Sequence, residues 1–314
     1  MYEDIGRLLG KGFETWRNNL RLCVPFLLNV VLSILALIPI IVALALVLYP
    51  AFSSLNISAN QSSTGLSSAN LSSEGSYPAD LSTDQILSLV TDNLATLIPA
   101  FVIFIVLELL ISAFFTSGAI GMAKQATKEG KTSLGTMWSS GRKNVLQMLI
   151  ASILITIITL AGAVFLLPAI LALPSIMDSS IMSNPASLGI VVLGVILLII
   201  YGLAVSMILS AVPYALVVDG LGAVQAIRAG VNFFMYNKSD VFMLWLIVIA
   251  IGIGMGMLGG STSLPGPAGT QVQPWSVITG IIDLFVLAPV YTVWWTRLYM
   301  SRTGKLGEEL RNPW

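Results

Sequence analysis

The sequence contains no histidine and only one cysteine, Cys23. These absences exclude a disulfide within the chain, a metal site with imidazole ligands, and any catalytic dyad or triad that uses histidine. Charged residues are also scarce, at 10% of the chain, whereas soluble domains carry about 25%. The 15 basic residues are matched by 15 acidic ones, so no basic domain is available to bind nucleic acid. We therefore expect no metal, no other cofactor and no nucleic-acid partner, and we identify no catalytic residue.

Apolar residues dominate the chain, at 56% of all positions, and the mean hydropathy is +0.91. A helix needs about 20 apolar residues to cross about 30 Å of hydrocarbon. Six segments reach this length, at about 22–48, 95–117, 145–173, 188–212, 241–259 and 276–298. The first is longer than the apolar part of a cleavable signal peptide, so we expect a retained anchor. The sequence predicts an all-α, polytopic protein with six transmembrane helices.

The positions of the basic residues predict the orientation in the membrane. All 15 lysines and arginines lie before the first segment, between the second and third, between the fourth and fifth, or from the end of the sixth onward. The loops at 49–94, 174–187 and 260–275 contain none. Loops rich in lysine and arginine stay in the cytoplasm. We therefore expect a multi-pass protein of the cell membrane with both termini in the cytoplasm.

The pattern also indicates an internal repeat of three helical hairpins. A short segment with helical apolar spacing precedes each odd-numbered span, within residues 5–20, 134–145 and 221–234. Such amphipathic segments lie in the membrane interface, with the apolar face toward the acyl chains. An asparagine suited to cap the following span comes next, at Asn19, Asn144 and Asn237. The alternative to a repeat is that membrane interfaces simply attract aromatic residues and asparagine. We predict one integral membrane domain over 1–314.

The first outer loop, residues 51–80, is rich in serine and is predicted to be a flexible, low-complexity segment. It contains three Asn-x-Ser sequons, at Asn56, Asn60 and Asn70. Their placement on the predicted outer side favours N-glycosylation and hence a glycoprotein. The alternative is that a segment composed largely of serine and asparagine creates sequons by chance.

Three polar residues inside the predicted spans are candidates for a function: Glu108, Asp283 and Asn29. A charge near the bilayer centre costs roughly 2.5–3.5 kcal/mol, so such residues are rare and often functional. Glu108 and Asp283 fall at different predicted depths, which argues against a shared proton. We expect Glu108 to be neutral and hydrogen-bonded between helices, near the depth of Asn29. The alternative is a proton or cation pathway through Glu108.

Two further motifs have mainly structural interpretations. Gly252, Gly256 and Gly260 in the fifth span have the small-xxx-small spacing that permits close helix packing, within the fold or between copies. Asp219-Gly220, followed by Ala223 and Arg228, shares part of the motif of lipid head-group transferases. The other carboxylates of that motif are missing, so we expect Asp219 to cap a helix start.

Two pairs of short stretches carry a family resemblance, mainly through small residues and proline: residues 118–123 with 129–133, and residues 213–220 with 226–228. They resemble a family of uncharacterised archaeal six-helix integral membrane proteins. More distantly, the chain is similar to the membrane domain attached to some glycerophosphodiester phosphodiesterases, although it contains no phosphodiesterase domain. The resemblance implies an architecture and no established activity.

These observations leave three functions open. The favoured one is a non-catalytic integral membrane protein for packing, assembly or lipid interaction, with membrane lipids and either a second copy or another membrane protein as partners. The second is a transporter or channel that couples protons or cations through Glu108. The third is a lipid-modifying enzyme that would use Asp219, Glu129 and cytoplasmic lysines.

Overall fold

The computed structural model describes residues 3–47, 49, 91, 93–168, 170, 185–260, 264–265, 271–272 and 274–306. The chain divides into two compact units. The first comprises Met1–Asn29 with Ser112–Trp314, and the second comprises Val30–Ile111. The serine-rich loop 51–80, including Asn56, Asn60 and Asn70, lies outside the described residues.

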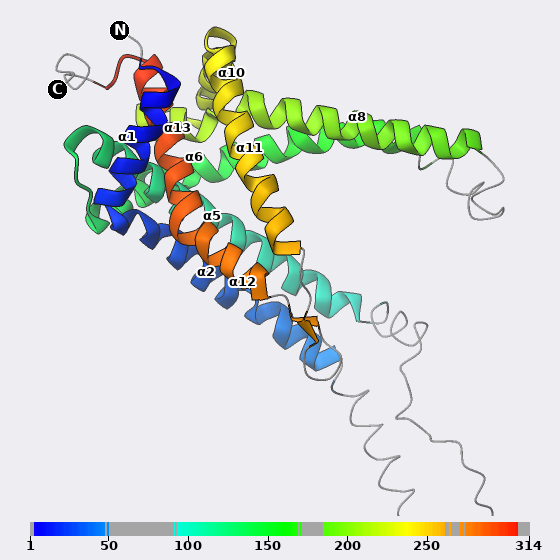
Figure 1. The fold of residues 1–314 in the computed structure, drawn as a ribbon. Helices are drawn as coiled ribbons and strands as arrows, with labels where there is room; N and C mark the ends of the chain where they lie inside the picture. The colour runs from blue at the N-terminus through cyan, green and yellow to red at the C-terminus, as the bar shows by residue number, and fades with distance from the viewer. Residues whose placement is uncertain are drawn as a thin grey trace, which may run out of the picture. The chain divides into compact units, whose positions relative to one another are not determined.

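The structure is almost entirely helical (Figure 1). Its helices are α1 (Ile5–Asn18), η1 (Leu20–Cys23), α2 (Val24–Ala36), α5 (Leu94–Glu129), α6 (Leu134–Leu160), η2 (Ala161–Leu166), α8 (Pro185–Leu209), α9 (Val212–Asp219), α10 (Ala223–Tyr236), α11 (Lys238–Gly260), α12 (Pro274–Ile282), η5 (Asp283–Leu287) and α13 (Ala288–Arg302). Two-residue strands, β1 (Leu264–Pro265) and β2 (Gln271–Val272), pair in antiparallel fashion.

All six predicted spans are confirmed as helices that are long and apolar enough to cross a membrane. They cover Leu20–Val47, Leu94–Glu129, Leu134–Leu166, Gly189–Asp219, Lys238–Met257 and Val277–Arg302. Large apolar side chains on them face outward, for example Ile34, Leu193 and Ile253, each more than half exposed. Such surfaces are stable against lipid and unstable against water. The fold is therefore that of a multi-pass membrane protein.

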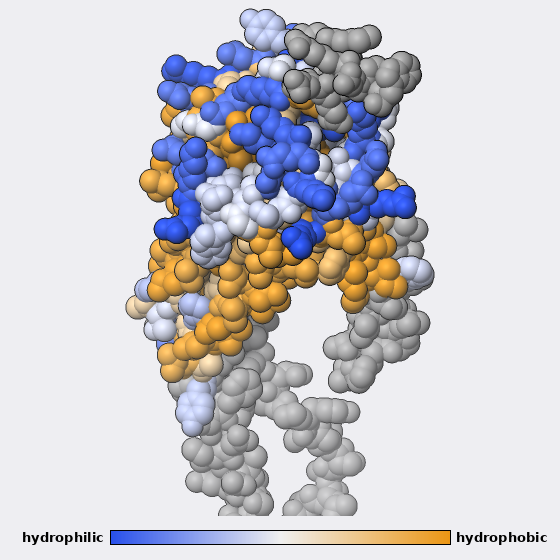
Figure 2. Space-filling model, turned by 90° about the vertical axis from the view of Figure 1, so that its left-hand side faces the viewer, coloured by the Kyte–Doolittle hydropathy of each residue, from blue (hydrophilic) through white to orange (hydrophobic). Residues whose placement is uncertain are grey.

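In the first unit, the helix ends that carry the lysines and arginines form a structure that we call the polar cap, defined as residues 3–23, 112–144, 211–240 and 288–306. On the face in Figure 2, hydrophilic residues gather at one end and give way to a zone of hydrophobic residues. Most of the fully buried side chains belong to the polar cap, including Leu8, Ile120, Met122, Leu216 and Leu298. The tightest packing of the described residues is therefore at the charged end of the spans.

Glycines bring the amphipathic segments onto the ends of the even-numbered spans. A Cβ atom at Gly12 of α1 would lie 2.3 Å from the Trp294 ring of α13, and one at Gly230 of α10 would lie 2.6 Å from Val212 of α9. In the second hairpin the glycine is on the span, where a Cβ at Gly118 of α5 would lie 2.8 Å from the Met137 side chain of α6. Each amphipathic segment thus packs on a span of the preceding hairpin, and the first packs on the last.

The three asparagines make the same side-chain bond, and this bond corrects their predicted role. The side-chain amide of each donates to the carbonyl oxygen four residues earlier, at 3.0 Å in all three cases: Asn19 to Thr15, Asn144 to Ser140 and Asn237 to Phe233. For Asn19 and Asn237 this bond lies at the end of the preceding helix, α1 or α10, rather than at the start of the following span. The capping prediction is wrong for Asn19, which makes no such bond, and for Asn144, which lies inside the uninterrupted helix α6.

The apolar faces of the amphipathic segments differ in part from the expectation of contact with acyl chains. Leu8 is fully buried and Gly12 lies against Trp294, which is itself only 8% exposed. Phe13 and Leu20, in contrast, are 46% and 63% exposed. The end of the sixth span also presents apolar side chains, and part of the apolar face of α1 packs against them. The remainder of that face, including Phe13, is exposed and available to lipid.

Candidate functional site

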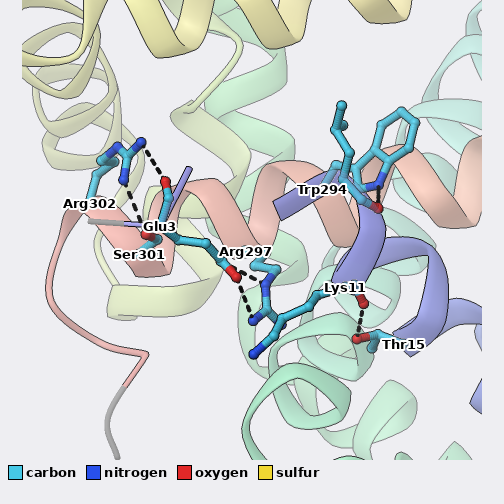
Figure 3. A network of polar contacts seen from close by, with 8 residues as sticks. Glu3, Lys11, Thr15, Trp294, Arg297, Ser301 and Arg302 are labelled. Atoms are coloured by element: carbon cyan, nitrogen blue, oxygen red, sulfur yellow. Dashed lines mark hydrogen bonds and ion pairs between the residues drawn. The ribbon is translucent and has the colours of Figure 1, made fainter. Parts of the chain in front are cut away.

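The two ends of the described chain are joined by a buried ion pair within the polar cap (Figure 3). The Arg297 guanidinium of α13 donates from Nε to Glu3 Oε2 at 2.9 Å and from Nη2 to Glu3 Oε1 at 3.1 Å. The two side chains are only 2% and 0% exposed. This two-bond geometry matches the planar fork of arginine to a carboxylate. Its position, on the helix that also binds α1, indicates a structural role.

Arg302, one and a half turns further along α13, extends this network to α11. Its Nε donates to Asp240 Oδ2 at 2.6 Å, and its Nη2 donates to the Glu3 carbonyl oxygen at 2.9 Å. Nearby, the Trp294 indole N–H donates to the Leu9 carbonyl oxygen at 3.0 Å (Figure 3). The start of α1, the start of α11 and the whole of α13 are therefore held together by charged and polar contacts.

Asp219 ends a helix, which corrects the prediction that it begins one. It is the last residue of α9, and Gly220 follows it with a positive φ of 67°. The carboxylate accepts a hydrogen bond from the Tyr299 hydroxyl at 2.9 Å and forms an ion pair with Lys305. The next helix, α10, begins instead with the backbone N–H of Ala223 bonded to the side-chain oxygen of Gln147 at 3.0 Å.

The polar cap contains an open cavity of about 470 Å³ between the ends of α5 and α6, with one residue of α9 in its wall. We call it the lysine cavity. Its wall includes three lysines and several neutral polar side chains; it is lined by Gly121, Lys124, Gln125, Lys128, Glu129, Thr136, Ser139, Ser140, Lys143, Asn144 and Val217. Sequence reasoning missed this site, because Lys143 lies on a different helix from the other two lysines.

The polar groups of the lysine cavity differ in how far their hydrogen bonds are satisfied. Lys124 is half-buried and its ammonium donates to the Val218 carbonyl oxygen at 2.8 Å. Glu129 accepts from the Gln125 amide at 2.9 Å. Lys128 and Lys143 are exposed, and neither forms an ion pair with any residue that the structure describes. The cavity therefore holds an excess of positive charge.

In the second unit, Glu108 of α5 is hydrogen-bonded to a residue that the sequence did not single out. The Ser33 hydroxyl donates to Glu108 Oε1 at 3.0 Å. The other carboxylate oxygen, Oε2, is buried and has no hydrogen-bond partner among the described residues. Asn29, in the first unit, likewise has a buried side-chain oxygen without a described partner. Ser33 could have been found from the sequence, because it lies four residues after Asn29 and therefore on the same face of the helix.

Asp283 is exposed and lies where the sixth span changes its winding. It begins the π-helical turn η5, and Pro289, four residues after Phe285, has no N–H to donate to the Phe285 carbonyl oxygen. That oxygen accepts hydrogen bonds from the Trp16 indole N–H at 3.1 Å and from the Cys23 thiol at 3.0 Å. The turn thus connects α12 and α13 to the start of the first span.

The remaining candidates make few contacts within the described chain. The glycine stripe of α11 runs from Gly252 to Gly260, the last residue of the helix. A Cβ atom at Gly252 or Gly256 would meet no atom within 4 Å, so no other described helix packs closely on these two positions. Packing of this stripe against a second copy remains a prediction. Across the described ranges, no group of three or more His, Cys, Asp or Glu side chains could hold a metal ion.

Comparison with known proteins shows the family. A protein of Archaeoglobus fulgidus that bears the name "Uncharacterized protein" is 26% identical over 310 residues, which is 98% of both chains. No solved structure matches the chain. Residues 80–298 match the model of DUF7847, described as a domain of unknown function. This match covers more than half of the sequence, and the chain therefore belongs to the DUF7847 family.

Proposed function

We propose that this chain is a non-catalytic integral membrane protein that interacts with lipids at the inner surface of the cell membrane. The observation that carries the proposal is that three carboxylates of the polar cap are engaged in ion pairs within the fold. Glu3, Asp219 and Asp240 are each paired with a basic residue from α13 or just beyond it. Each of these carboxylates has its counter-charge within the fold, and removal of one partner from a buried pair is strongly destabilising, which supports a structural role for them.

The orientation is part of the same proposal. Both termini and the polar cap lie in the cytoplasm, because all 15 lysines and arginines belong to the termini, to two loops or to the end of the sixth span. We also propose a distant relation to the membrane domain of some glycerophosphodiester phosphodiesterases, which would fit a protein that works among phospholipids. Exposed apolar residues of the amphipathic segments, such as Phe13 and Leu134, supply contacts for the interface.

The test is a paired measurement on purified protein in liposomes. We expect no proton or cation flux above that of empty liposomes, together with lipid that remains bound to the protein through detergent exchange and is identified by native mass spectrometry. Flux that requires Glu108, shown by its loss in Glu108→Gln, would contradict the proposal. Metal-dependent turnover of a lipid head group would also contradict it and would revive the enzyme hypothesis.

A second candidate function is a transporter or channel that uses Glu108. The observation in its favour is the buried Oε2 atom of Glu108, which has no partner among the described residues. A buried carboxyl oxygen without a hydrogen bond is costly, and in a membrane protein it is compatible with a proton or cation that binds transiently. The flux measurement above separates this candidate from the first.

A further inference from the structure

The lysine cavity lies at the boundary between the polar cap and the membrane-spanning part of α6. Lys143 and Asn144 line it, and the apolar run of the third span begins at the next residue, Val145. On the same helix Trp138 is 55% exposed, as expected for a tryptophan at the level of lipid head groups. A ligand in this cavity would therefore lie at the depth of a phospholipid phosphate.

The charges of the lysine cavity call for an anion. Three ammonium groups face one carboxylate, and that carboxylate already accepts a hydrogen bond from Gln125. The charges of Lys128 and Lys143 repel the Lys124 ammonium, whereas the Asp219 carboxylate attracts it but is already paired with Lys305. Like charges that line one cavity repel each other, and they do so more strongly near a protein surface than in bulk water. An anion between them would convert this repulsion into attraction.

The hydrogen-bond donors that remain are suited to phosphate. Lys124 uses one of its three N–H groups on the Val218 carbonyl oxygen, and two remain. Lys128 and Lys143 have no hydrogen bond or ion pair to the residues that the structure describes. Ammonium groups bind phosphate as point charges. The volume of about 470 Å³ falls within the range of small-ligand sites, about 300–1,000 Å³.

We infer that the lysine cavity is a binding site for a phosphate group, as carried by an anionic phospholipid or by soluble phosphate. Lys128 and Lys143 bind the phosphate oxygens from two different helices. Lys124, whose ammonium is held in place by its bond to the Val218 carbonyl oxygen of α9, binds them as a third donor. This inference deepens the proposed function and rests on it for the location of the cavity at the inner surface. Phosphate binding would also link α5, α6 and α9.

The experiment uses the full chain, purified in a non-ionic detergent at physiological salt, with short-chain phosphatidylglycerol and inorganic phosphate titrated separately. In the variant K128Q/K143Q, two exposed side chains change and the bond between Lys124 and Val218 remains. We expect its affinity for the phosphate-bearing probe to fall at least about tenfold, because two charge-assisted contacts are lost. Thermal unfolding of K128Q/K143Q should match that of the unaltered chain.

Two matched variants serve as controls. K131Q/K238Q removes the same charge from exposed positions outside the cavity, and its affinity should stay within about twofold, since salt screens distant charges. K128R/K143R keeps the charge and should bind nearly as the unaltered chain does. Equal losses in K131Q/K238Q and K128Q/K143Q, or no loss in K128Q/K143Q, would overturn the inference.

The two probes distinguish the source of the phosphate. Tight binding of phosphatidylglycerol that inorganic phosphate does not displace identifies a lipid, whereas binding of inorganic phosphate with the same sensitivity to K128Q/K143Q identifies a soluble ligand. Failure of the unaltered chain to bind either probe would overturn the site. A flux that depends on Glu108 would instead contradict the proposed function and leave the phosphate measurements unchanged, so the two failures are distinguishable.

Discussion

Glu3 and Arg297 are separated by 294 positions in the sequence and form a two-bond ion pair that is almost fully buried. Through this pair the residues just before α1 are fixed to α13, the last helix of the described chain. The Gly12 contact with Trp294 reinforces the same junction. The first and third hairpins are therefore connected directly and not only through the second.

We expect Arg297→Met to destabilise the protein by about 3–5 kcal/mol, because removal of one partner leaves the Glu3 carboxylate buried without its counter-charge. Unfolding by denaturant in detergent, followed by tryptophan fluorescence, measures the change. The double variant Glu3→Leu/Arg297→Met should recover much of the loss, since neither charge then remains buried. An Arg297→Met protein as stable as Arg228→Gln, which alters an exposed residue, would contradict a stabilising role for the pair.

Two glycines of α1 offer a matched test of the contact with α13. Gly12→Ala should lower the free energy of unfolding by about 1–3 kcal/mol, because the new methyl group would overlap the Trp294 ring. Gly10→Ala, two residues away, meets no atom within 4 Å, and alanine should stabilise the helix there by about 0.5–1 kcal/mol. Opposite signs in thermal unfolding support the packing. A stabilising effect at both positions would show that α1 does not lie against Trp294.

The contrast between these glycines shows what sequence reasoning could reach. The six spans and the repeated amphipathic segments follow from the length of apolar runs and from charge placement, because both properties are local. Gly10 and Gly12 cannot be told apart from the sequence. They differ because Trp294, 282 residues after Gly12, packs against Gly12 and not against Gly10. The same holds for Glu3, whose partner could not be chosen from among 15 basic residues.

The candidate site was less predictable, for a related physical reason. Lys124 and Lys128 are four residues apart, so their common helix face could be read from the sequence. Lys143 joins them because Gly118 and Gly121 let α6 approach α5 closely; a Cβ at Gly121 would lie 2.3 Å from the Ser140 hydroxyl oxygen. Conversely, Glu108 was identified from its rarity in a span, but its partner Ser33 was not, because serine is common in such helices.

The bond between Ser33 and Glu108 predicts a modest structural effect. Ser33→Ala should cost about 1 kcal/mol of stability, since it leaves both oxygens of the half-buried Glu108 carboxyl group without a described donor. Glu108→Gln keeps an oxygen acceptor for Ser33 and should unfold close to the unaltered protein. Thermal unfolding of the two variants, side by side, measures this order. A Glu108→Gln protein less stable than Ser33→Ala would indicate that the second carboxyl oxygen has a donor of its own.

The orientation can be tested with single cysteines in a Cys23→Ala background. We place one in the serine-rich loop at Ser67 and one in the carboxy-terminal tail at Glu308. In intact cells a membrane-impermeant maleimide should label Ser67→Cys and leave Glu308→Cys unlabelled until the membrane is permeabilised, because the lysine- and arginine-rich segments remain inside. Labelling of both positions from the same side would contradict the orientation. It would also remove the lysine cavity from the inner surface, because Lys143 and the tail lie on the same predicted side of the six spans.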